Sequence, residues 1–519
     1  MTQLPEMVQA LLKPAIYPEP TKGVELMQTQ MSFIFLTDNY VYKVKKPVNL
    51  GYLDYTTLKK RQHYCQKEVE LNRRLCPDVY LGVLPITQQQ SGFSIGGADK
   101  AVEYAVKMRR LPREGMMDVL LESNRVSPKM IVGVAEKLAS FHRQADTSKN
   151  ISNYGRPEII TRNTEENFTQ TEKYIGTTIS NHQYRQIRDY TRSFILGNTA
   201  LLTKRIKEGW IRDYHGDLHA AHICFSDGIC IYDCIEFNDR FRYGDTASEA
   251  AFLAMDLDHH GRADLGQRFT SAYASLRRDE DLPRLVNFYK SYRAYVRGKV
   301  ESFKLDDPYI SADEKRQTLE KASSYFDLAY SYTKSTPTLL ITTGLVGSGK
   351  SALAQALAKR LGLVVISSDV TRKQLAAIPE TEHRFEEFDT GIYSPEFSRK
   401  TYDAMFSTAR SILKEGGSVI IDASFIKSIE RLRAKGIAEG VRADFFILEV
   451  TLEEGLTRRR LAQRLKQGSV SDGRWQIYQQ QQGVLEPVTE VPPQNRVIID
   501  TSRPVDDYIR QVLSNINKE

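Results

Sequence analysis

Residues 344–351 read GLVGSGKS and follow the apolar run LLI at 339–341. The stretch fits the phosphate-binding pattern G-x-x-x-x-G-K-[ST], which requires a strand before the loop and a helix after it. Residues 352–361 have a helical pattern, so this context is present. Glycines let successive backbone N–H groups converge on an anion, and the helix N-terminus adds partial positive charge. The stretch therefore predicts a nucleoside triphosphate site in an α/β domain.

Within this loop, Lys350 is expected to reach the β- and γ-phosphates and Ser351 to hold Mg²⁺. The alternative is an ordinary glycine-rich turn before a helix. It is disfavoured because such a turn would not need the complete G-x-x-x-x-G-K-[ST] pattern, which is present here. The predicted nucleotide-binding residues of the loop are Gly344, Leu345, Val346, Gly347, Ser348, Gly349, Lys350 and Ser351.

Strand and helix patterns alternate on both sides of the loop. The predicted strands are 338–343, 363–366, 418–422, 444–450 and 496–500. Alternation of this kind favours βαβ units and a mostly parallel sheet with flanking helices. Ligands of such sheets gather at the carboxyl ends of the strands.

Polar residues at these strand ends predict a kinase. Asp369 follows the second strand, where it would act as the base for an acceptor hydroxyl, and Arg372 would hold a charged acceptor group. Asp422 ends the third strand, as a Mg²⁺-orienting acid would, although many buried strands end in Asp. Arg460 and Arg464 share a helix face after the fourth strand. They are expected to close over the phosphates, with a solvated basic face as the alternative.

Together these features resemble the small P-loop kinases related to zeta toxin, chloramphenicol phosphotransferase and the polynucleotide 5′-kinases. The resemblance covers about residues 338–505 and implies ATP and Mg²⁺ as ligands. One alternative is a nucleic-acid 5′-end kinase. The chain has no interleaved basic and aromatic stretch of the kind that binds single strands, so nucleic acid is not the expected partner.

A second group of chemistry-bearing residues precedes this domain. Residues 215–225 read HGDLHAAHICF, and residues 231–237 read IYDCIEF. Transfer of a γ-phosphoryl group needs a carboxylate for the attacking hydroxyl, metal ligands, and a lysine positioned by a helix glutamate. Asp217 and Asp233 supply two such carboxylates. Upstream, Lys43 and Lys45 lie two apart on one predicted strand, and so on one face of it.

These two stretches resemble the HGDxHxxN and IDxE signatures of the aminoglycoside and choline phosphotransferases, over about residues 25–330. The resemblance implies a bilobal, protein-kinase-like α+β fold that phosphorylates small-molecule hydroxyls. It makes Asp217 the catalytic base and Asp233 the main Mg²⁺ ligand. Lys43, or Lys45 on the same face, would contact phosphates, with Glu68, or less favourably Glu70, as partner.

The same resemblance places an adenine-binding hinge at 108–111 and loop-steadying acids at Asp245 and Glu249. One position departs from the family: its metal-binding Asn is His222 here, and Mg²⁺ prefers oxygen ligands. The domain would then use one well-held Mg²⁺, accept a softer metal, or act as a pseudokinase that senses a metabolite and regulates its neighbour. A plain loop histidine is the remaining alternative, and a zinc site of His215, His219 and His222 does not fit known zinc spacings.

Bulk properties agree with a multidomain protein. The 519 residues suggest two to four domains, and the net charge of +7 is mild. We expect a kinase-like domain at 1–330, with lobes at about 25–108 and 112–330, a linker at 331–337 and a P-loop domain at 338–519. Five cysteines without a CxxC pair, and no long apolar run, favour the cytoplasm and no membrane span. The predicted function is ATP-dependent phosphoryl transfer at two sites to small-molecule hydroxyls.

Overall fold

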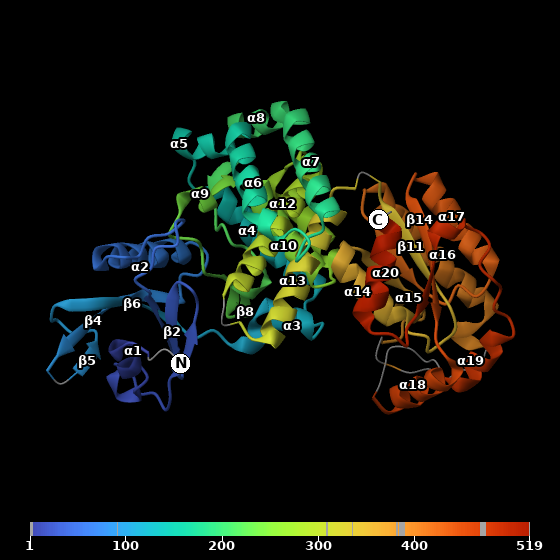
Figure 1. Ribbon diagram of the computed structural model, residues 1–519, viewed down its shortest axis with the longest axis horizontal. Helices are drawn as coiled ribbons and strands as arrows, with labels where there is room; N and C mark the ends of the chain where they lie inside the picture. The colour runs from blue at the N-terminus through green and yellow to red at the C-terminus, as the bar shows by residue number, and fades with distance from the viewer. Residues whose placement is uncertain are drawn as a thin grey trace. The chain divides into compact units, whose positions relative to one another are not determined.

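The computed structural model describes residues 4–90, 92–307, 310–334, 336–379, 382, 390–467 and 474–517. The chain divides into two compact units (Figure 1). The first comprises Met1–Glu166, Arg192–Asp256 and Gln267–Lys290, and the second Asn167–Thr191, Leu257–Gly266 and Ser291–Glu519. The predicted linker at 331–337 lies between helix α13 (Ala312–Ser331) and strand β11 (Thr338–Thr343). Its role as a domain boundary stays a prediction.

The first unit contains a six-stranded antiparallel sheet in the order β1-β2-β3-β6-β4-β5. Strands β2 and β3 pair so that Ile34 lies opposite Lys43. The strands are β1 (Glu25–Gln28), β2 (Ser32–Leu36), β3 (Tyr40–Lys45), β4 (Tyr80–Gln89), β5 (Gly92–Ile95) and β6 (Ala101–Arg109).

Helices α1 (Glu6–Leu11) and α2 (Leu58–Arg73) cover opposite faces of this sheet (Figure 1). Alternation along β3 explains the arrangement, because successive side chains of a strand point to opposite faces. Tyr42 and Val44 pack in the apolar cluster that includes Val8 and Leu11 of α1. Lys43 and Lys45 therefore extend to the other face, where α2 lies.

The helical part of the first unit contains α4 (Pro128–Gln144) and the start of α10 (Thr246–His259). Helix α3 (Met117–Glu122) ends before α4 begins. Asn124 adopts a left-handed conformation (φ 53°), and Pro128 follows the capping side chain of Ser127. Both features interrupt a helix, because Pro at the first helical position has no N–H to donate.

Two short antiparallel ribbons complete the first unit. Strand β7 (Ile211–Asp213) pairs with β10 (Tyr243–Asp245), and β8 (Ile223–Ser226) with β9 (Gly228–Ile231). A disulfide joins Cys230 of β9 to Cys76, which follows α2, with the two Cα atoms 4.9 Å apart. Cys65, Cys224 and Cys234 are free and buried. The spacing of the cysteines in the sequence did not indicate this pair.

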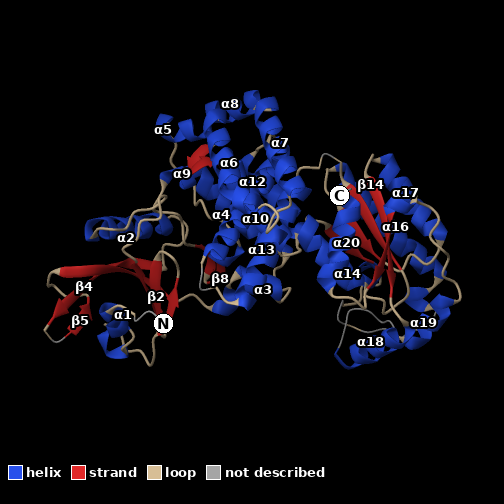
Figure 2. Cartoon of the chain, viewed as in Figure 1, coloured by secondary structure: helices blue, strands red, loops and turns tan. Residues whose placement is uncertain are grey.

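The second unit contains a five-stranded parallel sheet in the order β12-β13-β11-β14-β15. Its other strands are β12 (Val364–Ser367), β13 (Val419–Asp422), β14 (Asp444–Thr451) and β15 (Arg496–Asp500). Helices α14 (Lys350–Leu361) and α20 (Val505–Asn517) cover one face, and α16 (Pro395–Lys414) and α17 (Ser428–Gly440) the other (Figure 2). Leu340 packs against the first pair, and Leu339 and Ile341 against the second. The continuous apolar run of β11 thus reflects burial on both faces.

Within this unit, α13 packs beside α14, and Arg360 forms an ion pair with Asp327 at 2.9 Å. Further helices are α5 (Lys149–Ser152), α6 (Pro157–Thr171), α7 (Asn181–Gly197), α8 (Thr199–Lys207), α9 (Asp239–Arg242), α11 (Ala263–Arg277), α12 (Leu282–Phe303), α15 (Ser368–Leu375), α18 (Glu454–Gln467) and α19 (Trp475–Gln482). No helix in the described residues is long and apolar enough to cross a membrane. The predicted combination of an α+β part and a parallel-sheet P-loop part is confirmed.

Candidate functional site

The loop between β11 and α14 has the backbone geometry that its glycines predict. Gly344, Gly347 and Gly349 adopt φ values of 137°, 82° and 101°, which side-chain-bearing residues avoid. A Cβ atom on Gly344 would lie 2.3 Å from the carbonyl oxygen of Val450. Helix α14 begins at Lys350, so its N-terminal N–H groups and their partial positive charge lie at the loop. The Lys350 ammonium donates to the carbonyl oxygen of Leu345 at 2.8 Å.

The two predicted acids of this site follow neighbouring strands. Asp422 is the last residue of β13 and is buried, and its register partner on β12 is Ser367. Asp369 lies two residues beyond Ser367, in the first turn of α15. Both carboxylates therefore belong to the carboxyl-terminal edge of the sheet, where β11 leads into the glycine loop.

The predicted arginines are placed differently from one another. Arg372 is buried, donates to Ser398 Oγ at 3.2 Å and to the carbonyl oxygen of Ile392, and lies over the ring of Tyr393. Its guanidinium thus contacts the segment leading into α16. Arg460 donates to the hydroxyl and carbonyl oxygens of Thr501 at 3.0 and 2.6 Å.

A Cβ atom on Gly349 would lie 3.3 Å from Arg460 Nη1, so this arginine borders the glycine loop. Arg464 belongs to α18, but its side chain lies outside the described part of the chain.

Sequence reasoning missed one residue at this loop. The backbone N–H of Val346 donates to Gln481 Oε1 of α19 at 2.9 Å. Gln481 is one of four successive glutamines, 479–482, and such a run carries no motif that identifies a site residue. Only the packing of α19 separates it from its neighbours.

The upstream site brings both predicted lysines to one glutamate. Lys43 Nζ lies 2.8 Å from Glu68 Oε1 and 2.8 Å from Asp233 Oδ1. Lys45 Nζ lies 2.6 Å from Glu68 Oε2 and also contacts Glu236 and Tyr55. Burial alone would lower the pKa of Lys43, but the carboxylates of Asp233 and Glu68 raise that pKa well above its usual value. Both ammonium groups therefore stay charged.

Of the two lysines, Lys43 is the one that faces Asp233, whereas Lys45 is 1% exposed. Glu70, the less favoured partner, is exposed on α2. Glu236 stood in the quoted IYDCIEF stretch without an assigned role. Its contact with Lys45 crosses 191 residues of sequence, and local patterns do not report such a distance.

The loop that carries Asp217 is held by a buried acid. Glu249 Oε1 accepts from Gly216 N at 2.6 Å, and Glu249 Oε2 accepts from His215 N at 3.1 Å. His142 Nε2 lies 2.8 Å from the same Oε2 atom, and its Nδ1 lies 2.7 Å from the hydroxyl of Tyr273. Gly216 has φ 92°, and a Cβ there would lie 2.9 Å from the carbonyl oxygen of Phe241. The tight turn next to Asp217 thus needs both the glycine and the glutamate.

Asp217, His219 and His222 bring potential ligand atoms within 4.8 Å of one another. His222 Nδ1 lies 2.9 Å from the backbone carbonyl oxygen of Asp217, so Nδ1 carries the proton. Its Nε2 lone pair then points toward Asp233 Oδ2, 3.6 Å away. Burial, with a smaller effect of His219, lowers the pKa of His222 to about 4. Asp217, His219 and His222 lie close enough together to hold a metal ion, and Asp233 borders His222.

The predicted hinge at 108–111 follows β6. Arg109 N donates to the carbonyl oxygen of Val79, and Arg110 N to that of Asn39, both at 2.9 Å. These two N–H groups are already engaged within the protein. An adenine role for this segment stays a prediction.

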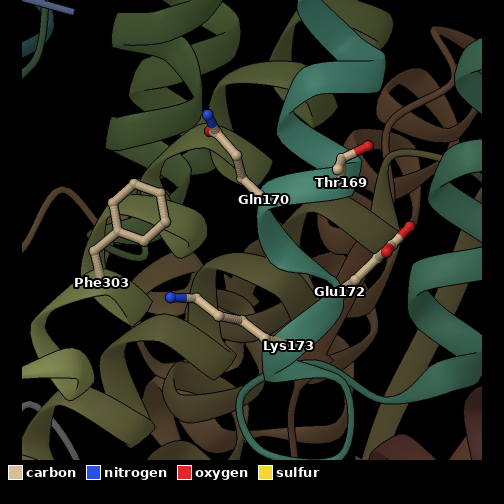
Figure 3. A pocket seen from close by; sticks show the side chains of 5 residues that line it. All are labelled: Thr169, Gln170, Glu172, Lys173 and Phe303. Atoms are coloured by element: carbon tan, nitrogen blue, oxygen red, sulfur yellow. The ribbon is translucent and has the colours of Figure 1, made fainter. Parts of the chain in front are cut away.

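A separate hollow of about 680 Å³ lies in the second unit (Figure 3). Lys173 forms an ion pair with Asp306 at 2.7 Å, and Gln170 accepts from Lys299 at 2.8 Å. The hollow is lined by Thr169, Gln170, Glu172, Lys173 and Phe303. None of these is a predicted site residue, and the hollow adds nothing to either site.

Comparisons with known proteins agree with this description. A family model described as an AAA domain matches residues 339–488. A shikimate kinase of Paramagnetospirillum magneticum is 29% identical over 162 residues, which cover 30% of this chain and 77% of that protein. The solved structure of the amicoumacin kinase hAmiN, in complex with AMP-PNP, Ca²⁺ and Ami, has 12% identity and a TM-score of 0.38. It covers 62% of this chain and 92% of its own.

The Mycobacterium tuberculosis protein Rv2004c, from strain H37Rv, is 32% identical over 405 residues, which cover 78% of each protein. An alignment of this extent includes most of the first unit as well as part of the parallel-sheet unit, since neither alone contains 405 residues. The chain therefore belongs to the same family as the mycobacterial protein Rv2004c.

Proposed function

We propose that the protein transfers the γ-phosphoryl group of ATP to hydroxyl groups of small molecules at two centres, one in each kinase-type fold. The chain is an ATP-dependent phosphotransferase. The glycine loop between β11 and α14 is the observation that carries this conclusion, because its geometry suits the phosphates of a nucleotide. The likeness of this part of the chain to a shikimate kinase supports a small-molecule acceptor.

At the C-terminal centre, the loop N–H groups and Lys350 hold the β- and γ-phosphates. Asp369 accepts the proton of the acceptor hydroxyl as its oxygen attacks the γ-phosphorus, and ADP leaves. Ser351 and Asp422 would hold Mg²⁺, which neutralises charge on the phosphates when bound. Arg460, beside Gly349, adds positive charge at the nucleotide.

At the N-terminal centre, Asp217 takes the hydroxyl proton and Lys43 contacts the phosphates, positioned by Glu68. Asp233 and His222 would hold the divalent cation. Oxygen donors suit Mg²⁺, whereas the imidazole nitrogen of His222 suits a borderline metal such as Mn²⁺ better. ATP supply places both reactions in the cytoplasm.

A nucleotide-binding experiment on the full chain tests this proposal. Isothermal titration with AMP-PNP and a divalent cation should give two sites per chain. Lys350→Ala should remove one site and Lys43→Ala the other, and the double variant should bind none. Two sites that survive in Lys350→Ala would refute the P-loop assignment.

Turnover is tested separately, by ADP release across a panel of hydroxylated metabolites. Asp217→Asn in a Lys350→Ala background should retain nucleotide binding and lose all ADP release. Binding without any turnover in the Lys350→Ala chain itself would instead identify the N-terminal domain as a pseudokinase. Labelling of 5′-hydroxyl oligonucleotides tests the end-kinase alternative. That alternative is not favoured, since the guanidinium of Arg372 is buried against Ile392 and Ser398.

A further inference from the structure

Helix α19 places one glutamine on the glycine loop. Val346 N donates to Gln481 Oε1 at 2.9 Å, and Gln481 is half-buried. The flanking Gln480 and Gln482 are exposed. Of the four successive glutamines, Gln481 is therefore the one whose side chain hydrogen-bonds to the glycine loop in the described part of the chain.

The position of Val346 gives this contact its meaning. Val346 is the third residue of the eight-residue loop, whose backbone N–H groups converge on the triphosphate. A carboxamide held on that N–H therefore borders the loop that would hold the phosphates. Lys350 likewise donates to the carbonyl oxygen of Leu345 within the loop. Protein oxygens thus accept hydrogen bonds from the Val346 N–H and the Lys350 ammonium, two groups that bind nucleotide in loops of this kind.

Neighbouring side chains fix α19 against the loop. Tyr478 is buried and stacks on Trp475, with ring centroids 4.7 Å apart and an interplanar angle of 11°. Arg458 of α18 lies over the Trp475 ring at 5.4 Å. A Cβ on Gly347 would lie 2.9 Å from side-chain atoms of Thr457 and Leu461, so α18 also packs tightly on the loop. Helices α18 and α19 therefore cover the loop together.

The chemistry of a carboxamide supplies the remaining step. Its oxygen accepts hydrogen bonds, and its nitrogen donates two. Oε1 of Gln481 is used by Val346, and Nε2 donates to no protein group in the described part of the chain. A donor at the third residue of the loop suits an oxygen of the γ-phosphate of ATP. ADP has no such oxygen.

We propose that Gln481 is a positioning residue that contacts the γ-phosphate at the C-terminal centre. Its Oε1 accepts a hydrogen bond from Val346 N–H, and its Nε2 donates one to the phosphate. The inference rests on the function proposed above. It makes α19 the element by which the protein distinguishes ATP from ADP. The transferred group is then held from both the loop and α19 while the acceptor attacks.

The test uses Gln481→Glu in the full chain. Glutamate has nearly the same shape and still accepts from Val346 N–H, but it donates nothing and places a negative charge at the γ-phosphate. We expect about tenfold weaker AMP-PNP binding at this site, with ADP affinity changed far less. Gln482→Glu, one residue away and exposed, adds the same charge and should bind both nucleotides as the wild type does.

Trp475 provides a local signal, since the chain has two tryptophans and Trp210→Phe leaves Trp475 alone. Its fluorescence should change more with AMP-PNP than with ADP, and Gln481→Glu and Gln481→Ala should remove that difference. Lys350→Ala should abolish both responses.

Wild-type selectivity for AMP-PNP over ADP in both Gln481 variants would overturn the inference and leave the proposed function intact. A wild-type chain whose Trp475 and titration signals respond to no nucleotide would overturn both.

Discussion

Lys43 Nζ lies 2.8 Å from Asp233 Oδ1, and this ion pair joins the third strand of the antiparallel sheet to the residue two positions beyond β9. The two residues are 190 positions apart in the chain. Asp233 has a left-handed backbone (φ 63°), so its carboxylate is directed by a conformation that most residues avoid. The pair brings together the lysine proposed to contact the phosphates and the acid proposed to hold the metal.

The two neighbouring lysines should differ in effect when replaced. Lys43→Ala should abolish nucleotide binding at the N-terminal centre and destabilise the chain less than a change at Lys45, because Lys43 is partly exposed and Lys45 still pairs with Glu68. Lys45→Met should lower the free energy of unfolding by about 3–5 kcal/mol, because it leaves Glu68 and Glu236 with less compensation in a buried site. Titration with AMP-PNP and urea unfolding would separate the two. A stable Lys45→Met chain that binds no nucleotide there would reverse the assignment.

His222 should set the metal preference of the N-terminal centre. In a Lys350→Ala background, the chain should bind AMP-PNP more tightly with Mn²⁺ than with Mg²⁺, because a nitrogen ligand suits Mn²⁺ better. His222→Asn should shift this preference toward Mg²⁺ by about tenfold. Direct Mn²⁺ binding, followed by electron paramagnetic resonance, provides a readout besides activity. An unchanged preference in His222→Asn would show that the imidazole is no ligand.

The buried Arg205 should be a major contributor to stability. It pairs with Asp245 at 2.6 Å and with Asp279 at 2.7 Å, and all three side chains are buried. Arg205→Met should cost about 3–5 kcal/mol of unfolding free energy, because two buried carboxylates lose their counter-charge. The adjacent Lys204 is the matched control: it pairs with Asp281 at an exposed position, and Lys204→Met should leave stability nearly unchanged. Equal losses in the two variants would contradict this account.

Acidification should loosen the loop that carries Asp217. Burial lowers the pKa of His142. Burial would raise the pKa of Glu249, but His142, His215 and the N–H of Gly216 together lower it below its usual value. For both groups the unfolded chain binds more protons, so their contribution is complete above about pH 6.5 and is lost as pH falls. The melting temperature should therefore drop between pH 7 and pH 5. His142→Gln should flatten that dependence, and an equally steep curve in the variant would exclude His142 as its source.

The Cys76–Cys230 disulfide should stabilise the first unit in oxidising conditions. It closes a segment of 154 residues, and removing such a bond typically costs about 2–5 kcal/mol. Dithiothreitol should lower the melting temperature of the wild type and leave that of Cys76→Ser unchanged. Cys65→Ser, which removes a buried free thiol, should retain the response to reductant. A wild type insensitive to reductant would show that the two thiols are not joined in solution.

The sequence alone predicted the glycine loop, the alternating strands and helices around it, and the two lysines on one face of β3. These features are local: a turn that needs glycines, a buried run of apolar residues and a two-residue period are all written in adjacent positions. Breaks in helices were harder to predict, as α3 and α4 show, because one left-handed residue and one proline decided them.

Only the tertiary structure decided which of the matching side chains meet. It placed Lys43 rather than Lys45 against Asp233, turned Arg372 into the protein, and set Gln481 apart from three identical neighbours. These outcomes depend on contacts between segments up to 190 residues apart. The glycine loop could be predicted from the sequence because its conformation depends on adjacent residues of its own backbone. The roles proposed for the residues around it depend on which side chains the fold packs beside them.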